Sequence, residues 1–520
     1  MTAQSVNSPH EQSRATELKV GAVLSYVGLG MQFVVAMLYT PIMLRLLGQT
    51  EYGLYNIVGS IVSYLSLLSF GLGGAYLRFY ARFRVSDDSA GIRRLNGTFL
   101  IVFTAIALVA AGVGAFMTAN AGFLLGGEFA ANELRTGRIL FAILTFNLTF
   151  MFPFTVFDSY ILAHERFIFQ KSLQILKTVV SPLAILPVLL LGHHSIGLAT
   201  ATTIVNVVFT AATAAYSWFA LEMRFQLRGF DFALLREVSA FSGFIFINLI
   251  VDQVNWNVDK FIVGRFRGAA AVAVYGIGSL FSVYYLTFST AISSVFAPRV
   301  NEMVARNASP GELSELFTRV GRLQFLVLGL VASGFAFFGR PFITLWAGRD
   351  YTDAYLIALL LIVPVTIPLV QNLGIEIQKA MNMHHFRSWV YLGVAIVNVL
   401  LSIPLARRYG GVGAAAATAI ALVVGNGLII NWHYRARVRL DVSHFWRQIL
   451  GLSFGLVPGL AVGIVAVMVS DLSRPGELLV AVITYGIAYV GGMWWLGMND
   501  YERAVFVEPL QRIFKPSDRS

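Results

Sequence analysis

Two polar stripes cross an apolar stretch in the middle of the chain, and their residue types are those that bind ions or polar ligands. The first consists of Asn248, Asp252, Asn255 and Asp259, and the second of Gln253, Asn257 and Lys260. Intervals of three, four and seven residues place each stripe on one face of a helix. A carboxylate in the middle of a bilayer costs about 2.5–3.5 kcal/mol, so such a face must look into water or protein. We expect a cavity wall that handles ions or a polar substrate; a packed polar seam, with Asp259 and Lys260 near the interface, is the alternative.

Asp158 and Glu376 are further candidates for ion coupling, because each lies in an otherwise apolar stretch. Asn147 shares a helix face with Asp158, while Asn372 and Lys379 share one with Glu376. The alternatives are local. Asp158 would then lie at the membrane interface, and Glu376 would pair with Lys379 one turn away.

Four cations are candidates for contacts with an anionic group of a substrate, namely Lys260, Lys379, Lys177 and Arg78. Lys177 lies about one turn inside a predicted span, where it either snorkels to the surface or meets an anion. Arg78 ends the run Gly71-Leu-Gly-Gly-Ala-Tyr-Leu-Arg78, and a cation at a cavity mouth suits phosphate. The alternatives are a topology-setting Arg78 and a snorkelling Lys379.

The composition is that of a chain that lies mostly in lipid. Hydrophobic residues make up 57% of the 520 residues and charged residues 12%, with a mean hydropathy of +0.72. Soluble domains carry about 25% charged residues. These values exclude a soluble enzyme with a membrane anchor, a disordered chain and a repeat solenoid. The net charge of +11 is therefore interpreted as loop charge that sets topology, not as a surface for nucleic acid.

Signatures of enzymes and metal sites are absent from the sequence. It contains no cysteine, which excludes disulfides, thiolate metal sites and cysteine nucleophiles. P-loop and H-E-x-x-H motifs are also missing, and the pairs His193-His194 and His384-His385 have no companion ligands. We therefore expect a transporter rather than an enzyme, with no catalytic residue, no metal and no resident cofactor.

Apolar stretches predict fourteen membrane spans. They lie at about 20–44, 53–77, 97–118, 138–162, 173–192, 196–220, 239–263, 270–296, 323–346, 354–378, 388–405, 411–432, 449–470 and 477–497. The stretches are long and continuous, which favours helices over the short alternating strands of a barrel. Basic residues, Arg319 and Arg322 among them, are more frequent in the loops of one side. The positive-inside rule then predicts that both termini are cytoplasmic.

The chain also repeats itself weakly. Gly59, Ser60 and Ser63 correspond to Gly278, Ser279 and Ser282, and a run from Gly197 corresponds to one from Gly413 at a nearly constant offset. Six spans per copy make the repeats parallel, which is a transporter architecture. We predict an all-α polytopic membrane protein with two parallel six-helix repeats around a central cavity, plus two C-terminal helices. The predicted parts are a cytoplasmic segment 1–19, six-helix halves 20–238 and 239–448, a helix pair 449–498 and a cytoplasmic tail 499–520.

Three segments resemble motifs of polysaccharide-transporter flippases. They are Leu46-Leu-Gly-Gln-Thr-Glu-Tyr-Gly-Leu-Tyr55, Val258-Asp-Lys-Phe-Ile-Val-Gly264 followed by Gly268 and Tyr275-Gly-Ile-Gly278, and Gly71-Leu-Gly-Gly74 ending in Arg78. The family is the Wzx-like O-antigen and exopolysaccharide flippases of the multidrug/oligosaccharidyl-lipid/polysaccharide exporter superfamily. The resemblance covers spans 1–12 in organisation and all fourteen in number. The resemblance implies functional roles only for Asp259, Lys260 and Arg78, because only these candidates lie within the matching motifs.

The resemblance implies a bacterial inner-membrane carrier that moves a polyprenyl-pyrophosphate-linked oligosaccharide to the periplasmic leaflet. Such a carrier works by alternating access, coupled to a Na⁺ or H⁺ gradient. Its partners would be the lipid-linked glycan, the bilayer, and a polysaccharide polymerase with its chain-length machinery, but no nucleic acid.

Three alternatives stay open. A cation-coupled multidrug exporter and a peptidoglycan-precursor flippase belong to the same superfamily. A polyprenyl-linked glycan ligase or glycosyltransferase belongs to another class, and it would need an outer loop with catalytic carboxylates or arginines, which the sequence does not show.

Overall fold

The computed structural model describes residues 9–126, 128–228 and 232–514, and within these ranges it contains helices and turns but no strand. This confirms the predicted all-α class. Eleven helical segments in the same ranges are long and apolar enough to cross a membrane. The chain divides into two compact units, unit 1 (1–273) and unit 2 (274–520). The predicted part boundaries at 238/239 and 448/449 stay predictions.

Glycines in the left-handed region break three of the longest helices. Gly48 (φ 73°) interrupts α1, Gly268 (φ 74°) interrupts α8, and Gly410 (φ 62°) interrupts α12. The spanning segments that contain them are 63, 57 and 54 residues long. One crossing needs about 20 residues, so each segment is long enough for two. Fourteen spans would result if each crosses twice, and that number stays a prediction.

The same glycines fall at corresponding places in the two proposed repeats. Gly48 follows the first predicted span and Gly268 follows the seventh, while Gly410 corresponds to Gly192 (φ 81°) after the fifth. Glycine adopts this backbone region without the steric cost that other residues meet. Equivalent chain reversals in both halves therefore support the internal repeat.

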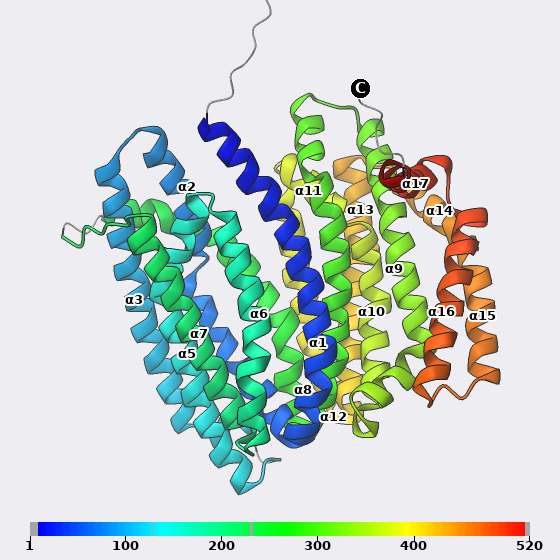
Figure 1. Cartoon of the computed structure of the whole chain (residues 1–520), viewed down its shortest axis with the longest axis horizontal. Helices are drawn as coiled ribbons and strands as arrows, with labels where there is room; N and C mark the ends of the chain where they lie inside the picture. Colours follow the sequence, from blue (N-terminus) through cyan, green and yellow to red (C-terminus); the bar gives the residue numbers. More distant parts are fainter. Residues whose placement is uncertain (1–8, 127, 229–231, 515–520) are drawn as a thin grey trace, which may run out of the picture. The chain divides into compact units, whose positions relative to one another are not determined.

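Unit 1 is a set of long helices joined by short turns. Its elements are α1 (Pro9–Ser63), η1 (Tyr64–Ser69), α2 (Leu72–Val85), α3 (Ser89–Ala119), α4 (Ala121–Leu125), α5 (Ala131–Ala163), α6 (Phe167–Leu190), α7 (His194–Ala215), η2 (Tyr216–Ala220) and the first part of α8 (Phe232–Ala305). α5 packs against α3 and α7, and α6 packs against α1 and α7 (Figure 1). A buried cluster that includes Tyr76, Tyr80, Phe99 and Phe103 joins α2, α3 and α5.

Unit 2 is built in the same way around α9. Its elements are the rest of α8, α9 (Pro310–Trp346), η3 (Arg349–Tyr351), α10 (Ala354–Val370), α11 (Leu373–Ala380), α12 (His384–Leu422), η4 (Val423–Ile430), α13 (Asn431–His433), η5 (Tyr434–Val438), α14 (Val442–Ser453), η6 (Phe454–Leu456), α15 (Val457–Val469), α16 (Pro475–Gly492), η7 (Met493–Gly497) and α17 (Asp500–Phe514). α9 contacts α10, α14 and α16, and α15 packs on α16. In Figure 1, α11, α13, α14 and α17 gather at one end of this unit.

Two of the three segments that carry flippase-like motifs, Leu46–Tyr55 and the segment from Val258, pack closely in unit 1. A Cβ on Gly53 would lie 1.8 Å from the carbonyl oxygen of Ala269, and a Cβ on Gly264 would lie 2.0 Å from Cδ1 of Ile57. Real Cβ atoms do not approach a backbone oxygen so closely, so position 53 requires glycine, whereas a Cβ at position 264 would require the Ile57 side chain to shift. The motifs therefore fix how the second stretch of α1 lies against α8.

We expect Gly53→Ala to lower the thermal stability of the protein by about 1–3 kcal/mol, the usual cost of overpacking. The new methyl group would meet a backbone carbonyl, which cannot rotate away as a side chain would. Gly30→Ala is the matched control, because nothing lies within 4 Å of a Cβ at that position of α1. Equal melting temperatures of the two purified variants in detergent would contradict this packing.

A buried ion pair fixes the C-terminal elements to α9. Nε and Nη2 of Arg322 donate to the two carboxylate oxygens of Glu502 at 2.5 and 2.9 Å. Arg322 is 7% exposed and Glu502 is 0% exposed. Nη1 of Arg322 also donates to the carbonyl of Gln448 at 3.1 Å, and Nη2 to that of Gly497 at 2.9 Å. Arg322, counted above among the loop charges, therefore lies within α9 and is buried and paired in unit 2, while its contribution to topology stays a prediction.

Candidate functional site

A cavity of about 290 Å³, lined by both polar and apolar residues, lies within unit 1 between α1, α5 and α8. The polar residues of its wall are Tyr55, Asn56, Ser60 and Ser63 on α1, Asn147 on α5, and Asn257 and Lys260 on α8. They reach the same space because the motif glycines bring α1 and α8 together. The cavity thus joins residues from helices that are far apart in the sequence.

Lys260 is the charged group of this cavity. Among the described residues that line it, no other side chain carries a charge. Lys260 is half-buried, and its ammonium has neither a hydrogen bond nor an ion pair within the described ranges of the chain. An ammonium offers three donors and no acceptor. Lys260 is therefore available to an anionic ligand, which would form the stronger, charge-assisted type of hydrogen bond.

The amides around Lys260 are partly committed to one another, and this leaves defined atoms for a ligand. Asn56 donates to the carbonyl of Tyr52 at 2.9 Å, which leaves its amide oxygen as an acceptor. Asn147 accepts from Asn206 at 3.1 Å, which leaves its amide nitrogen as a donor. Hydroxyl-rich ligands such as sugars both donate and accept hydrogen bonds. The cavity therefore combines a cation for an anion with amides for a polar, uncharged group.

A hydrogen-bonded seam joins α8 to α1 and to η1 beside the cavity. Nε2 of Gln253 donates to Ser66 at 2.8 Å, and its Oε1 accepts from Asn257 at 2.6 Å and from Ser63 at 3.3 Å. The seam includes two members of the second polar stripe. Its bonds orient Asn257, the neighbour of Lys260 in the cavity wall.

The first polar stripe does not form one uniform wall. Asp252 is exposed and Asn255 is half-buried, whereas Asp259 is only 2% exposed and lies within electrostatic range of Tyr64. The side chain of Asn248 lies outside the described residues. Asp259 is therefore packed, as the alternative interpretation expects, and a role of Asp252 in ion coupling stays a prediction.

The candidates on α5, α6 and α2 do not line this cavity. Asp158 on α5 and Lys177 on α6 lie close enough for their charges to interact, so Lys177 has a counter-charge within unit 1. Arg78 is exposed on α2 and has an interaction of its own. A role for these three residues in substrate binding stays a prediction.

Glu376 and Lys379 in unit 2 pair with each other at 2.9 Å, as the local alternative predicts. Asn372 is the N-cap of α11 and precedes Leu373, the first residue of that helix, so Asn372, Glu376 and Lys379 belong to one helical turn series that is separate from α10. Asn372 is buried and donates to Ser289 and Ser293 at 3.2 and 3.0 Å. It therefore packs against α8 instead of extending a polar face with Glu376.

Comparison with known proteins places this site in a family. The family model described as "Polysaccharide biosynthesis protein" matches residues 42–356, more than half of the chain. The chain belongs to the polysaccharide biosynthesis protein family. A relative in Bacillus subtilis (strain 168), the "Uncharacterized membrane protein EpsK", is 19% identical over 75% of this chain and 77% of its own length.

Solved structures give the fold of this polysaccharide biosynthesis protein. The lipid II flippase MurJ in an inward closed conformation matches with a TM-score of 0.68 at 14% identity, over 96% of this chain and 99% of its own. An inward-facing multidrug resistance MATE family transporter of the MOP superfamily matches with a TM-score of 0.58 at 14% identity, over 81% and 99%. The chain therefore shares its fold with a lipid II flippase and with a multidrug transporter, as the predicted all-α transporter architecture requires.

The matched range of the polysaccharide biosynthesis family includes every residue of the cavity wall. Sequence reasoning missed the contribution of α1 to this wall. Asn56, Ser60 and Ser63 recur at i, i+4 and i+7, which is the spacing of one helix face. That spacing, directly after the Leu46–Tyr55 motif, was the available signal.

Among the described residues, no three His, Asp or Glu side chains come together as a metal site requires.

Proposed function

We propose that the protein moves a polyprenyl-pyrophosphate-linked oligosaccharide across the bacterial inner membrane for surface polysaccharide biosynthesis. The observation that supports this is the unpaired Lys260 in a cavity of amides and hydroxyls, in a chain of the polysaccharide biosynthesis family. A pyrophosphate requires a cation, and a glycan requires donors and acceptors for its hydroxyl groups. The cavity supplies both kinds of group.

The size of the cavity limits what it holds. About 290 Å³ is near the lower end of the roughly 300–1,000 Å³ of small-ligand pockets. In this proposal the cavity takes the pyrophosphate and the adjoining sugar, and the remaining sugars and the lipid tail lie outside it. A lipid whose phosphate headgroup carries no sugar would then bind to this cavity more weakly than the lipid-linked oligosaccharide does.

To test this function, the gene for the protein is switched off in its own bacterium, and the fate of the lipid-linked oligosaccharide is followed. The lipid-linked oligosaccharide should accumulate, and its glycan should stay protected from a membrane-impermeant label in spheroplasts. Restoring the wild-type chain should restore both labelling and surface polysaccharide. Normal surface polysaccharide in the depleted cells would contradict the proposal. A block in peptidoglycan synthesis instead would support the peptidoglycan-precursor alternative.

We also propose that a cation gradient drives the alternating-access cycle, and that it acts by changing the protonation or cation binding of Asp252. An exposed carboxylate in the middle of a predicted span must be hydrated, protonated or bound to a cation, and each state can change as the protein changes conformation. Glu376 is the weaker candidate because Lys379 already neutralises it.

Asp252→Asn is therefore expected to abolish the dependence of transport on an imposed Na⁺ or H⁺ gradient. The amide keeps the shape of the side chain but neither binds a proton at neutral pH nor attracts a cation. The measurement is transport of the lipid-linked glycan in proteoliposomes with and without the gradient. Glu376→Gln, which alters a paired carboxylate, is the comparison variant. Normal gradient-dependent transport by Asp252→Asn would remove Asp252 from coupling.

Both termini of the protein are proposed to be cytoplasmic, with the polysaccharide polymerase and chain-length machinery as its partners in the membrane. A reporter that is active only in the periplasm should be inactive when fused after Ser520 and active when fused at Gly192. The excess of basic residues on one side of the membrane is the reason for this expectation. Periplasmic activity after Ser520 would overturn the proposed topology.

A further inference from the structure

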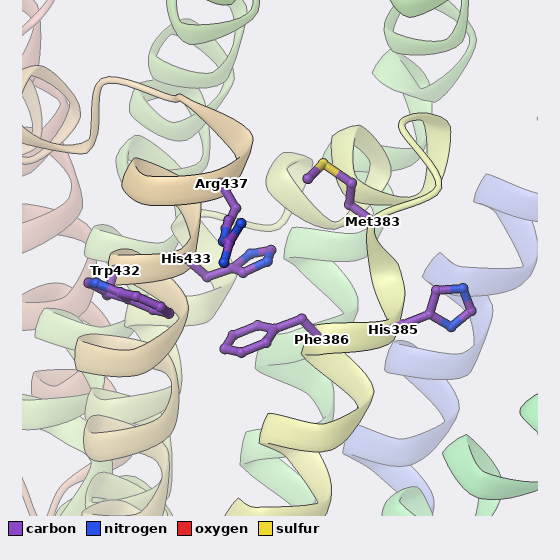
Figure 2. Close-up of a pocket in the computed structure, with 6 residues that line it drawn as sticks. All are labelled: Met383, His385, Phe386, Trp432, His433 and Arg437. Atoms are coloured by element: carbon purple, nitrogen blue, oxygen red, sulfur yellow. The ribbon is translucent and has the colours of Figure 1, made fainter.

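A second cavity, of about 350 Å³, lies within unit 2 and belongs to no part of the proposed transport site. Its lining residues come from the start of α12, with Met383, His385 and Phe386, and from α13 and η5, with Trp432, His433 and Arg437 (Figure 2). The two segments face each other at the end of unit 2 where α11, α13, α14 and α17 gather (Figure 1). In the proposed topology this is the cytoplasmic end.

The inner wall of this cavity is held firmly. His433 is only 4% exposed, and the Phe386 ring stacks on its imidazole with centroids 4.2 Å apart and an interplanar angle of 6°. Nδ1 of His433 lies 3.0 Å from Nε2 of Gln378, which is also buried. A histidine held by stacking and by a hydrogen bond keeps its orientation. The wall is therefore formed before any ligand binds.

Arg437 gives the cavity its charge. It is exposed, and Figure 2 shows its guanidinium beside His433, between the two segments. The charge of Arg437 acts on His433, yet no carboxylate lines the cavity. Within the described ranges Arg437 has no ion pair and no hydrogen bond. A guanidinium presents five donors in a planar fork that fits phosphate oxygens.

The surroundings of the cavity change from apolar to basic along one helical segment. On one side, Leu428 is 64% exposed and Trp432 is 58% exposed, so apolar and aromatic surface leads to the cavity. On the other side, Arg435 and Arg439 are exposed together with Arg437. Tryptophan gathers where lipid tails meet headgroups, and basic residues gather just beyond. The cavity therefore lies at the depth of lipid headgroups.

We propose that this cavity binds the phosphate of an anionic phospholipid of the cytoplasmic leaflet. The Arg437 guanidinium contacts the phosphate oxygens, and the acyl chains follow the exposed apolar surface at Leu428 and Trp432. Basic pockets between spanning helices on the cytoplasmic side are a recognised type of lipid headgroup site. The carrier lipid also ends in a phosphate, but bulk anionic phospholipid is the occupant that the open, lipid-facing position favours.

The test measures lipid binding to the purified full-length protein by native mass spectrometry, with no transport step. The probes are phosphatidylglycerol, phosphatidylcholine, polyprenyl phosphate and inorganic phosphate, each added separately. We expect tighter binding of phosphatidylglycerol than of phosphatidylcholine. Arg437→Ala should weaken phosphatidylglycerol binding about fivefold, the effect of one basic residue at a lipid surface. Arg437→Lys should keep most of the preference.

Arg435→Ala is the matched control, because Arg435 is an exposed arginine of the same segment that does not line the cavity. It should lose clearly less phosphatidylglycerol binding than Arg437→Ala does. Because Arg437 is exposed, its replacement should leave the melting temperature in phosphatidylcholine nanodiscs unchanged. Adding phosphatidylglycerol to the nanodiscs should then raise the melting temperature of Arg437→Ala by less than it raises that of the wild type.

Three results would overturn the proposal. The first is equal binding of the two phospholipids by the wild-type protein. The second is the same loss of phosphatidylglycerol in Arg435→Ala as in Arg437→Ala. The third is an Arg437-dependent preference for polyprenyl phosphate, or for inorganic phosphate, over phosphatidylglycerol, which would assign the site to another phosphate source. None of these results depends on whether the protein flips a glycan.

Discussion

Lys260→Ala is expected to reduce transport of the lipid-linked oligosaccharide about tenfold or more. A hydrogen bond to a charged group contributes about 1.5–3 kcal/mol, and its loss leaves the pyrophosphate without its cation in the cavity. Lys260→Arg keeps the charge and should retain more transport than Lys260→Ala. The measurement is the initial rate of glycan translocation in proteoliposomes that contain equal amounts of each variant.

Lys171→Ala is the control for a general loss of positive charge in unit 1, because Lys171 lies on α6 away from this cavity. It should transport at the wild-type rate. Melting temperatures separate a transport effect from misfolding, since Lys260 has no hydrogen bond or ion pair to lose within the described ranges. Wild-type rates for Lys260→Ala would show that the cavity does not contact the substrate.

Glu502→Gln is expected to destabilise unit 2 by about 3–5 kcal/mol, because it leaves the guanidinium of Arg322 buried without its counter-charge. The melting temperature should fall strongly, and α17 should become accessible to protease. Glu315→Gln breaks the pair with Arg319, in which the carboxylate is 70% exposed, and should change stability by about 1 kcal/mol or less.

The double variant Arg322→Met/Glu502→Leu tests whether the charges or the packing stabilise this contact. Removing both charges should recover much of the lost stability, because a buried pair gains little over apolar groups of similar size. A double variant no more stable than Glu502→Gln would show that the remaining bonds of Arg322, to Gln448 and Gly497, carry the stability.

The helical class could be predicted from the sequence because the apolar stretches leave few alternatives in lipid. The breaks in the long helices were also predicted, because Gly48, Gly268 and Gly410 each lie in a gap between two predicted spans. Hydropathy does not show which residue of each gap makes the turn, and the positive φ of these glycines does. Arg322 could not be assigned from the sequence, because its partner Glu502 lies far away in the C-terminal tail.

The candidate site was predicted in part. Periodicity identified two polar stripes on α8, but it does not fix how the helix is rotated about its axis. The structure shows that Asn257 and Lys260 of the second stripe line the cavity, while Asp259 is buried. The side of the wall formed by α1 was missed, because small polar residues such as Ser60 and Ser63 are common in helix contacts. The pairing of Glu376 with Lys379 was visible from their spacing alone.

Reconstitution of the purified protein tests the central claim most directly. Liposomes carry a polyprenyl-pyrophosphate-linked oligosaccharide in the inner leaflet, and a membrane-impermeant reagent reports the glycans that reach the outer leaflet. We expect rapid, protein-dependent exposure of this glycan and little transport of small cationic dyes by the same liposomes. Transport of the dyes without any exposure of the glycan would contradict the account and identify a multidrug exporter.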